Sequence, residues 1–270
     1  MADVIGIERS GRVAEIRMMR PNQMNTLDEA LADALPAAFR SVADDPAVHA
    51  VVLSGEGRSF MAGGDLACFR ADLAAAPATA GRLIDGFHAA MRTIAAMPQP
   101  VIAAVQGPVA GGGVGLAFAC DLVVAAADAT FLSAYTKLGT SPDGGTTWTL
   151  ARAIGAKRAL AFLLLNDRMT AAQAHEFGLV NAVVPAADLA RAARDMAERV
   201  AAGSVGATRS VKRLVGLAAT NPHDAQLDDE RAGFVAAAGT ADFREGVTAF
   251  FERRPPAFPD RAEPAGPSSR

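Results

Sequence analysis

Hydrophobic and polar positions divide the chain into two regions with different organisation. Through the first two thirds, short apolar runs that predict strands alternate with longer segments that predict helices. Repeated strand–helix alternation is typical of the α/β class with layers of parallel sheet. From Ala186 onward the pattern is helical only, so we expect a core at residues 1–200 and a helical region at residues 201–270. The predicted C-terminal helices span residues 187–202, 206–219, 222–238 and 241–253.

The first long helix is predicted from a cap and an apolar periodicity. Asn25 or Thr26 can cap a helix from Leu27 towards Ala43, because a short polar side chain can accept a hydrogen bond from the first turn. Pro36 lies inside this run and has no backbone N–H to donate. The sequence therefore predicts a kink or a break in the helix at Pro36.

Turn residues mark the other elements of the core. Alternating segments on either side of Ser10-Gly11 predict a β-hairpin, and Gly155 is expected to divide a helical stretch in two. Thr170 is expected to cap a short helix that ends at Gly178. The predicted strands are residues 4–7, 13–17, 48–53, 101–106, 122–126, 129–133 and 180–184, and the predicted helices are residues 81–97, 114–120, 146–154 and 156–165.

Two glycine-rich turns each join a predicted buried strand to a predicted helix. The first reads S-G-E-G-R-S-F-M-A-G-G-D-L (residues 54–66), and the second reads Q-G-P-V-A-G-G-G (residues 106–113). The first N–H groups of a helix have no internal partner and lie at the positive end of its dipole. Such a turn can receive an anion or an oxygen that becomes anionic during a reaction. The alternative is that the glycines only allow close helix–strand packing.

Composition excludes several functional classes. A net charge of −3 argues against a nucleic-acid binder, which usually carries a basic excess. Cys68 and Cys120 lie far apart, so we expect free thiols in a reducing compartment. The first residues do not resemble a signal peptide, and no apolar run reaches membrane-spanning length, so we expect a cytoplasmic protein without a membrane partner. The abundance of alanine, glycine, arginine and proline is typical of a high-GC bacterial genome.

The residue pattern also excludes common cofactor sites. Histidines, cysteines and carboxylates do not occur at metal-ligand spacing. The glycines at residues 111–113 do not form a dinucleotide or nucleoside-triphosphate motif. We therefore expect neither a metal nor a separate cofactor.

Several segments together carry a family resemblance. F-M-A-G-G-D-L is followed along the chain by A-A-V-Q-G-P-V-A-G-G-G-V-G-L-A-F-A-C-D, by L-G-T-S-P-D-G-G-T-T-W-T-L-A-R-A-I-G and by A-A-Q-A-H-E-F-G-L-V-N-A-V-V. A closing E-G-V-T-A-F-F-E-R-R-P-P-A-F completes the series. In this order and spacing the segments resemble the crotonase, or enoyl-CoA hydratase/isomerase, superfamily. The resemblance covers nearly the whole chain.

The resemblance implies a fold and a substrate class. The implied fold is a spiral of repeated ββα units with a C-terminal helical region that forms a homotrimer or a dimer of trimers and supplies part of the coenzyme A pocket. The implied substrate is an acyl-CoA thioester, so that coenzyme A is part of the substrate. The backbone N–H groups of Gly64 and Gly112 are implied to form an oxyanion hole for the thioester oxygen.

The resemblance also implies where coenzyme A lies. Its adenine and pantetheine are expected along two segments, mostly at backbone atoms, and Arg253 is expected to reach a coenzyme A phosphate. Tyr135 is expected on the substrate side of the pocket. The residues of the two segments are Gln23 and Met24, with neighbouring Asn22, and Ala62, Asp65 and Leu66.

Three positions decide which reaction the resemblance implies. The two glutamates with which hydratases of the family hold water correspond to Gly115 and Tyr135 here. Neither residue can accept a proton from water at neutral pH, which argues against efficient hydration. Asp143, in S-P-D-G-G, resembles the carboxylate of the isomerase branch, which includes Δ3,Δ2-enoyl-CoA isomerases and ring-opening phenylacetyl epoxide-CoA isomerases. We therefore expect Asp143 to shuttle a proton while the oxyanion hole holds an enolate.

Alternative roles remain open at this stage. Asp143 precedes a predicted helix, so it is also a candidate N-cap. Aryl-CoA dehalogenases of the superfamily use an Asp nucleophile at this position together with a His that corresponds to His88, but Tyr135 stands where they have a Trp. An enoyl-CoA hydratase-like protein with weak or no hydration, and a non-catalytic acyl-CoA binder, are further alternatives.

Overall fold

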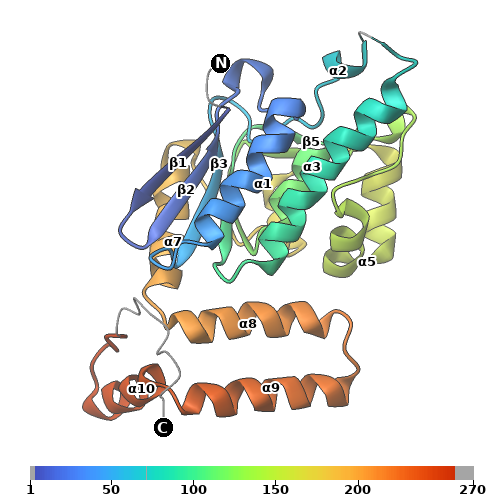
Figure 1. Cartoon of the computed structure of the whole chain (residues 1–270). Helices are drawn as coiled ribbons and strands as arrows, with labels where there is room; N and C mark the ends of the chain where they lie inside the picture. The colour runs from blue at the N-terminus through green and yellow to red at the C-terminus, as the bar shows by residue number, and fades with distance from the viewer. Residues whose placement is uncertain (1–3, 71, 259–270) are drawn as a thin grey trace.

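The computed structural model describes residues 4–70 and 72–258, and a six-stranded sheet forms its centre (Figure 1). The strand order is β1-β2-β3-β4-β6-β9; β1 and β2 are antiparallel, and every other neighbouring pair is parallel. The predicted hairpin and the predicted parallel sheet are thereby confirmed. The strands are β1 (Ile5–Ser10), β2 (Val13–Met18), β3 (Ala50–Gly55), β4 (Val101–Val105), β6 (Leu122–Ala126) and β9 (Ala182–Val184).

Both faces of this sheet are buried, which explains the nearly continuous apolar runs of its central strands. In β3, Val51 and Leu53 point to the face covered by helices α1 and α3, whereas Ala50 and Val52 point to the face covered by α7. The same alternation continues through β4 and β6. The three helices are α1 (Glu29–Ala43), α3 (Ala76–Ala96) and α7 (Leu189–Ala201).

A second, three-stranded sheet lies beyond the end of the first. Its order is β5-β7-β8, from β5 (Pro108–Ala110), β7 (Thr130–Leu132) and β8 (Met169–Thr170). The chain therefore passes from β4 into a short strand before the glycines of the second turn, where the sequence suggested only a turn. Helix α4 (Gly112–Ala119) follows, and it is buried along most of its length.

The start of α1 differs from the prediction. Its N-cap is Asp28, whose carboxylate accepts a hydrogen bond from Leu31 N at 2.9 Å. Asn25 is fully buried and instead accepts from Arg20 N, at 2.9 Å, and donates to the carbonyl of Ser59 at 2.8 Å. Thr26 is likewise no cap, since its hydroxyl donates to a carbonyl within the loop. Asn25 is therefore used for a tertiary contact and Thr26 for a contact within the loop, and the helix begins later.

Pro36 does not break α1, which runs through it as one helix. Proline has no N–H for the carbonyl four residues earlier, which belongs to Ala32. That carbonyl faces Gly86 of α3: a Cβ added to Gly86 would lie 2.6 Å from Ala32 O. The glycine thus allows the two helices to cross at close range beside the Ala32 carbonyl, which lacks its usual N–H partner at residue 36.

Other predicted boundaries are confirmed or shifted by a few residues. Helix α5 (Thr146–Leu165) is interrupted at Gly155, where φ is 77° and ψ is 156°, as expected. Thr170 forms a capping box with Gln173 at the start of α6 (Ala171–Glu176). Helix α3 begins five residues earlier than predicted, with Pro77 in its first turn, where a missing N–H is harmless. A short helix, α2 (Ala67–Arg70), precedes it.

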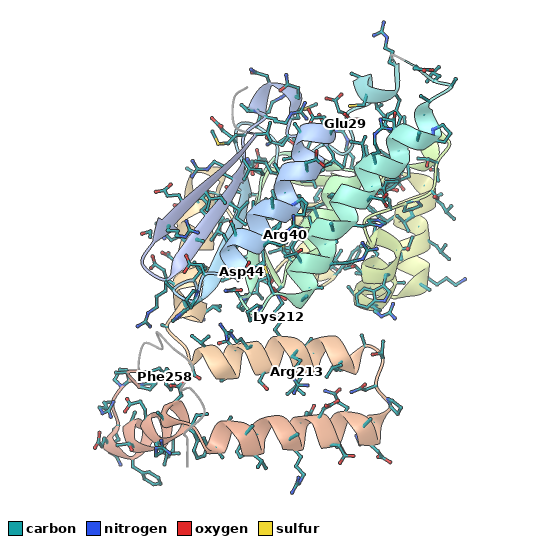
Figure 2. All side chains as sticks on the ribbon, in the orientation of Figure 1. Glu29, Arg40, Asp44, Lys212, Arg213 and Phe258 are labelled. Carbon is teal, nitrogen blue, oxygen red and sulfur yellow. The ribbon has the colours of Figure 1, made fainter. Side chains whose placement is uncertain are left out.

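The C-terminal helices α8 (Val205–Ala218), α9 (His223–Ala238) and α10 (Ala241–Glu252) form an arm that lies beside the core (Figure 1). Lys212 of α8 connects this arm to the core, donating to Asp121 at 2.7 Å and to two carbonyls, those of Ile94 and Gln99. On the other side of α8, Arg213 pairs with Asp229 of α9 at 3.7 Å (Figure 2). The predicted boundary between residues 200 and 201 falls at the last turn of α7.

None of the helices within residues 4–70 and 72–258 combines the length and the apolar character needed to cross a bilayer.

Candidate active site

The two glycine turns lie against each other. A Cβ added to Gly63 would lie 3.1 Å from Ala110 O and 3.7 Å from the Cα of Gly111, so only backbone fits between them. Both glycines have positive φ, 94° at Gly63 and 50° at Gly111. This is a region that residues with a Cβ rarely adopt. The turns are therefore brought together by glycines that immediately precede Gly64 and Gly112.

Gly64 and Gly112 carry free backbone donors. Within the described part of the chain, no acceptor receives a hydrogen bond from the N–H of either residue. The neighbouring N–H groups are used: Asp65 N donates to Leu27 O at 2.9 Å, and Gly111 N donates to Leu132 O at 3.0 Å. Gly112 is also the first residue of α4, where the N–H group has no partner in the helix. Two unpaired donors on adjacent turns suit an oxygen that becomes negative.

The alternative role of the glycines, which is to allow close packing, applies to Gly113. A Cβ at Gly113 would lie 2.0 Å from Met61 O, so the second turn can approach the first only if residue 113 is glycine. The three consecutive glycines thus have different roles. Gly111 makes the turn, Gly112 carries a free donor, and Gly113 permits the close contact with Met61 O.

Asp143 lies beside the second turn. Its Oδ1 is 3.9 Å from the position that a Cβ of Gly112 would occupy, and it accepts a hydrogen bond of 2.5 Å from the hydroxyl of Tyr135. Burial, and then the charge of Asp143, raise the pKa of Tyr135 above its usual value, so the phenol is protonated and acts as the donor. The carboxylate is partly buried. Its Oδ2 accepts no hydrogen bond within the described part of the chain.

Asp143 is not the side-chain cap of α5. The N-cap is Gly145, in the left-handed region at φ 71°, and its helix has no side-chain cap. What stabilises the helix start is the backbone carbonyl of Asp143, which accepts from Thr146 N at 3.0 Å and from the Thr146 hydroxyl at 2.7 Å. The capping alternative for the Asp143 carboxylate is therefore wrong, because the carboxylate turns away from the helix toward Tyr135.

Helix α3 packs against the loop that carries Asp143. The ring of Phe87 lies between the two segments: an added Cβ would be 3.3 Å from it at Gly112 and 2.6 Å from it at Gly144. The next residue, His88, accepts a hydrogen bond at Nε2 from Gly144 N at 3.1 Å. Since an accepting Nε2 carries no proton, this contact requires neutral His88 with its proton on Nδ1. Sequence reasoning did not single out Phe87, because a buried aromatic residue in an amphipathic helix carries no specific signal.

The position of the first hydratase glutamate has no room for a side chain. A Cβ at Gly115 would lie 2.8 Å from the Thr146 hydroxyl and 2.9 Å from Gly144 O. The loop that carries Asp143 therefore occupies the space into which a side chain at residue 115 would project.

The candidate coenzyme A residues come from two segments that lie side by side. Ala62 N donates to Met24 O at 3.1 Å, and Leu27 N donates to Gly63 O at 2.8 Å. Gln23 and Leu66 are exposed, and Asp65 is partly buried and caps the start of α2 through Ala67 N at 3.1 Å. These segments thus form one edge next to the first glycine turn.

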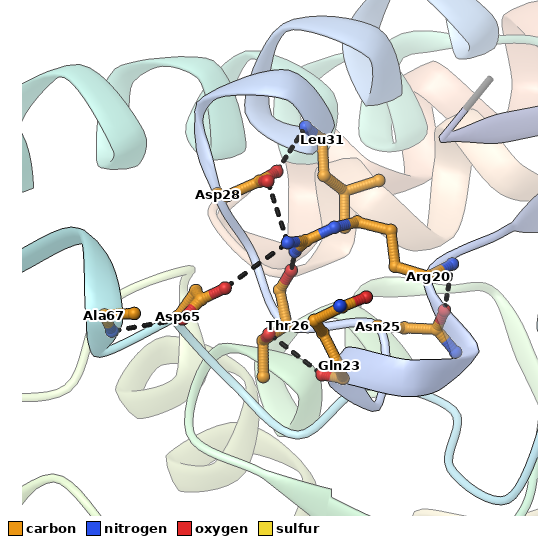
Figure 3. Close-up of polar contacts among 8 residues, drawn as sticks. All are labelled: Arg20, Gln23, Asn25, Thr26, Asp28, Leu31, Asp65 and Ala67. Atoms are coloured by element: carbon orange, nitrogen blue, oxygen red, sulfur yellow. Dashed lines mark hydrogen bonds and ion pairs between the residues drawn. The ribbon is translucent and has the colours of Figure 1, made fainter. Parts of the chain in front are cut away.

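Arg20 joins these two segments and was missed from sequence. Its guanidinium contacts Asp28 at 2.8 Å, Asp65 at 3.3 Å and the carbonyl of Thr26 (Figure 3). The side chain is largely buried, so the paired carboxylates compensate a charge that would be costly alone. The sequence contains no local signal for Arg20, because its partners are distant in the chain or follow a turn.

Arg253 is not brought to this edge within one chain. It is exposed, adopts a left-handed conformation at the end of α10 and lies in the arm, at the opposite end of the molecule from α2 (Figure 1). Its expected contact with a coenzyme A phosphate stays a prediction.

A cavity of about 340 Å³ opens between α1 and α3, beside Asp65 rather than at Asp143. In the described part of the chain, no cluster of three or more His, Cys, Asp or Glu side chains could hold a metal ion. The residues lining the cavity are Asp28, Glu29, Ala30, Cys68, Thr79 and Arg82.

Comparisons with known proteins match most of the chain. The sequence profile of enoyl-CoA hydratase/isomerase matches residues 8–261. The chain is 36% identical to the 1,2-epoxyphenylacetyl-CoA isomerase of Escherichia coli (strain K12) over 247 residues, which are 91% of this chain and 94% of that protein. It is 33% identical to 4-chlorobenzoyl coenzyme A dehalogenase-1 of Arthrobacter sp over 248 residues, 91% of this chain and 90% of the relative. The crystal structure of an enoyl-CoA hydratase from Polaromonas sp. JS666 superposes with a TM-score of 0.90 at 36% identity, covering 93% of this chain and 98% of that one.

Proposed function

We propose that this chain, which belongs to the enoyl-CoA hydratase/isomerase family and has its crotonase fold, is an acyl-CoA isomerase that uses Asp143 as its proton shuttle. The substrate is an acyl-CoA thioester in which a double bond is shifted or a ring is opened. The observation that carries the proposal is the carboxylate of Asp143 beside Gly112, whose N–H is unpaired.

The chemistry needs one base and one oxyanion site. Asp143 takes a proton from the carbon next to the thioester carbonyl, and the electrons of that C–H bond move into the enolate. The N–H groups of Gly64 and Gly112 donate to the enolate oxygen, each such donor lowering the barrier by about 3 kcal/mol. The protonated Asp143 then returns the proton to a carbon further along the acyl chain, so that no atom is gained or lost.

The surroundings of Asp143 support isomerisation over hydration. Hydration needs a second acid or base to hold water, and glycine at residue 115 offers none. The contacts of Gly115 with Gly144 and Thr146 leave no space for water-holding groups on that side. Tyr135, at the position of the other glutamate, is committed to Asp143 as a donor.

The replacement Asp143→Asn tests the proposed base. It keeps the size of the side chain but removes its ability to take a proton, so we expect turnover of a 3-enoyl-CoA to fall by a factor of about 10²–10⁴. Turnover is measured by mass spectrometry of the enoyl-CoA isomers with the purified enzyme. Unchanged turnover in a folded variant would remove the assignment.

A dehalogenase is the second candidate, and His88 is the observation that favours it. The imidazole lies against the Asp143 loop, and one relative is a 4-chlorobenzoyl-CoA dehalogenase. Against it, Nε2 of His88 is engaged by Gly144, and a donor on Asp143 Oδ1 weakens a nucleophile. Release of halide from a halobenzoyl-CoA would favour this candidate, whereas thermal stabilisation by coenzyme A esters without any turnover would favour a non-catalytic binder.

We also propose the assembly that such a site would use. The exposed apolar residues of the arm, among them Phe234, Phe250 and Phe251, suit contacts between copies in a homotrimer or a dimer of trimers. Arg253 lies at the end of the same arm, and we infer that it reaches the coenzyme A site of a neighbouring copy. The free thiols support the proposal of a cytoplasmic enzyme. We propose further that the enzyme is bacterial and that, since coenzyme A is part of the substrate, it needs no separate cofactor.

A further inference from the structure

Tyr135 occupies an unusual place for a tyrosine. Only 7% of it is exposed, and its hydroxyl donates to Asp143 Oδ1 at 2.5 Å. The distance is typical of a strong hydrogen bond between a hydroxyl and an ionised carboxylate. The contact spans only eight positions of sequence, across the turn that follows β7.

The backbone around Tyr135 is built to hold this contact. The preceding residue, Ala134, has φ of 63°, in the left-handed region that residues with a Cβ rarely adopt. The carbonyl of Tyr135 accepts hydrogen bonds from Leu138 N at 2.9 Å and Thr140 N at 3.2 Å, which close the turn. A strained residue next to a functional group is typical of an active site rather than of a core that only needs filling.

The contact makes the two oxygens of Asp143 unequal. Oδ1 receives the phenol proton, while Oδ2 receives no hydrogen bond within the described part of the chain. Because burial and the charge of Asp143 raise the pKa of Tyr135, the phenol keeps its proton through the neutral range. An oxygen that already accepts a strong hydrogen bond is the poorer base of the two.

We propose that Tyr135 is a positioning residue that reserves Oδ1 of Asp143 and leaves Oδ2 to take and return the substrate proton. The inference rests on the proposed isomerase function and refines it: the tyrosine stands at the position of a hydratase glutamate but orients the one remaining carboxylate. The expectation that Tyr135 lies on the substrate side of the pocket stays a prediction beside this role.

The replacement Tyr135→Phe removes one oxygen atom and keeps the ring. We expect kcat for a 3-enoyl-CoA to fall by about 10–100-fold at nearly constant KM, because the carboxylate is no longer fixed.

Thr136→Val provides a matched control. Thr136 is the next residue, and its hydroxyl accepts a hydrogen bond from Asn166 rather than contacting Asp143. The replacement therefore also deletes one hydrogen-bonded hydroxyl. We expect Thr136→Val to be destabilised to a similar extent and to keep the kcat and KM of the parent enzyme. An unchanged kcat in Tyr135→Phe, or the same fall in kcat in both variants, would overturn the inference.

A spectroscopic test does not depend on turnover. Tyr135 is the single tyrosine of the chain, so the tyrosine part of the near-ultraviolet spectrum reports on it alone. At neutral pH, Asp143→Asn is expected to shift this band, because the phenol no longer donates to a charged acceptor; an unshifted band would also contradict the inference.

If the parent enzyme turns over no acyl-CoA but the band shifts, the proposed function fails while the contact stands. If the parent is active and Tyr135→Phe has an unchanged kcat, only the positioning role fails.

Discussion

At the scale of single residues, the site depends on groups that hold Asp143 from both sides. Tyr135 donates to the side chain, and His88 accepts from the backbone N–H that follows it. The two contacts come from different elements, so the carboxylate is fixed relative to Gly112 by more than its own rotamer. The proposed isomerase mechanism needs only this one carboxylate.

The replacement His88→Phe is expected to loosen this loop. It keeps an aromatic ring but leaves the partly buried N–H of Gly144 without its acceptor, which lowers the free energy of unfolding by about 1–3 kcal/mol. We expect kcat to fall by about tenfold or more, because small displacements of a base are costly. Stability is measured by urea unfolding and kcat with a 3-enoyl-CoA.

His49→Phe is the control for this replacement. The Nδ1 atom of His49 lies 3.3 Å from Ala201 O, on the face of the sheet covered by α7. We expect it to leave kcat unchanged. Equal kcat values for the parent and the two variants would show that the Gly144 contact does not support catalysis.

At the scale of elements, glycines set how closely α4 approaches its neighbours. Gly113 lets its first turn meet Met61, and Gly115 lets its second turn meet the loop between Asp143 and Thr146. A helix this apolar is buried on all sides, so its packing rather than its helix propensity decides its position. Glycine at residue 115, the position that corresponds to a hydratase glutamate, is therefore required by the local packing.

The replacement Gly115→Ala tests this packing. Its Cβ would approach Gly144 O and the Thr146 hydroxyl within 3.0 Å, so we expect the free energy of unfolding to fall by about 1–3 kcal/mol despite the better helix propensity of alanine. Because the displaced loop carries Asp143, isomerase activity should fall as well. Gly115→Glu is expected to disturb the loop in the same way and not to create hydratase activity.

Gly81→Ala is the matched control. Gly81 lies in α3, and an added Cβ would meet nothing within 4 Å. We expect this variant to be as stable as the parent or more stable by up to about 1 kcal/mol, with unchanged activity. Stability in Gly115→Ala that matches Gly81→Ala would contradict the packing explanation.

At the scale of the whole molecule, the arm of α8, α9 and α10 lies apart from most of the core. Lys212 attaches it to Asp121, which also accepts from Val101 N at the start of β4. The arm exposes large apolar side chains, including Phe250 at 76% and Phe251 at 78%. Clustered exposure of this extent is typical of a surface that another chain covers.

The double replacement Phe250→Ser and Phe251→Ser tests the proposed assembly. We expect the parent chain to have the mass of three or six chains by light scattering after gel filtration, and the double variant to dissociate at low concentration, because apolar burial drives association. Leu73→Ser is the control, since Leu73 is 75% exposed but lies outside the arm. A monomeric parent chain would contradict the assembly.

The sequence by itself determined the strands of the central sheet and the two glycine turns. Continuous apolar runs such as β4 and β6 follow from burial of both sheet faces, and Gly111 and Gly155 have backbone conformations that few other residues adopt. Hydrophobic periodicity and backbone sterics are local, so they can be read along the chain. The order of these segments was also enough to indicate the family.

Only the tertiary structure decided how the site is held together. Three of its features depend on residues that are distant along the chain. They are the contact of Arg20 with Asp65, the contact of His88 with Gly144, and the close approach of the Gly144 carbonyl to Gly115. The cap of α1 moved to Asp28 because buried Asn25 was needed elsewhere. Whether a polar side chain caps a helix, pairs with a distant group or holds a carboxylate depends on which partners the folded chain brings within hydrogen-bond range, and local pattern does not contain that information.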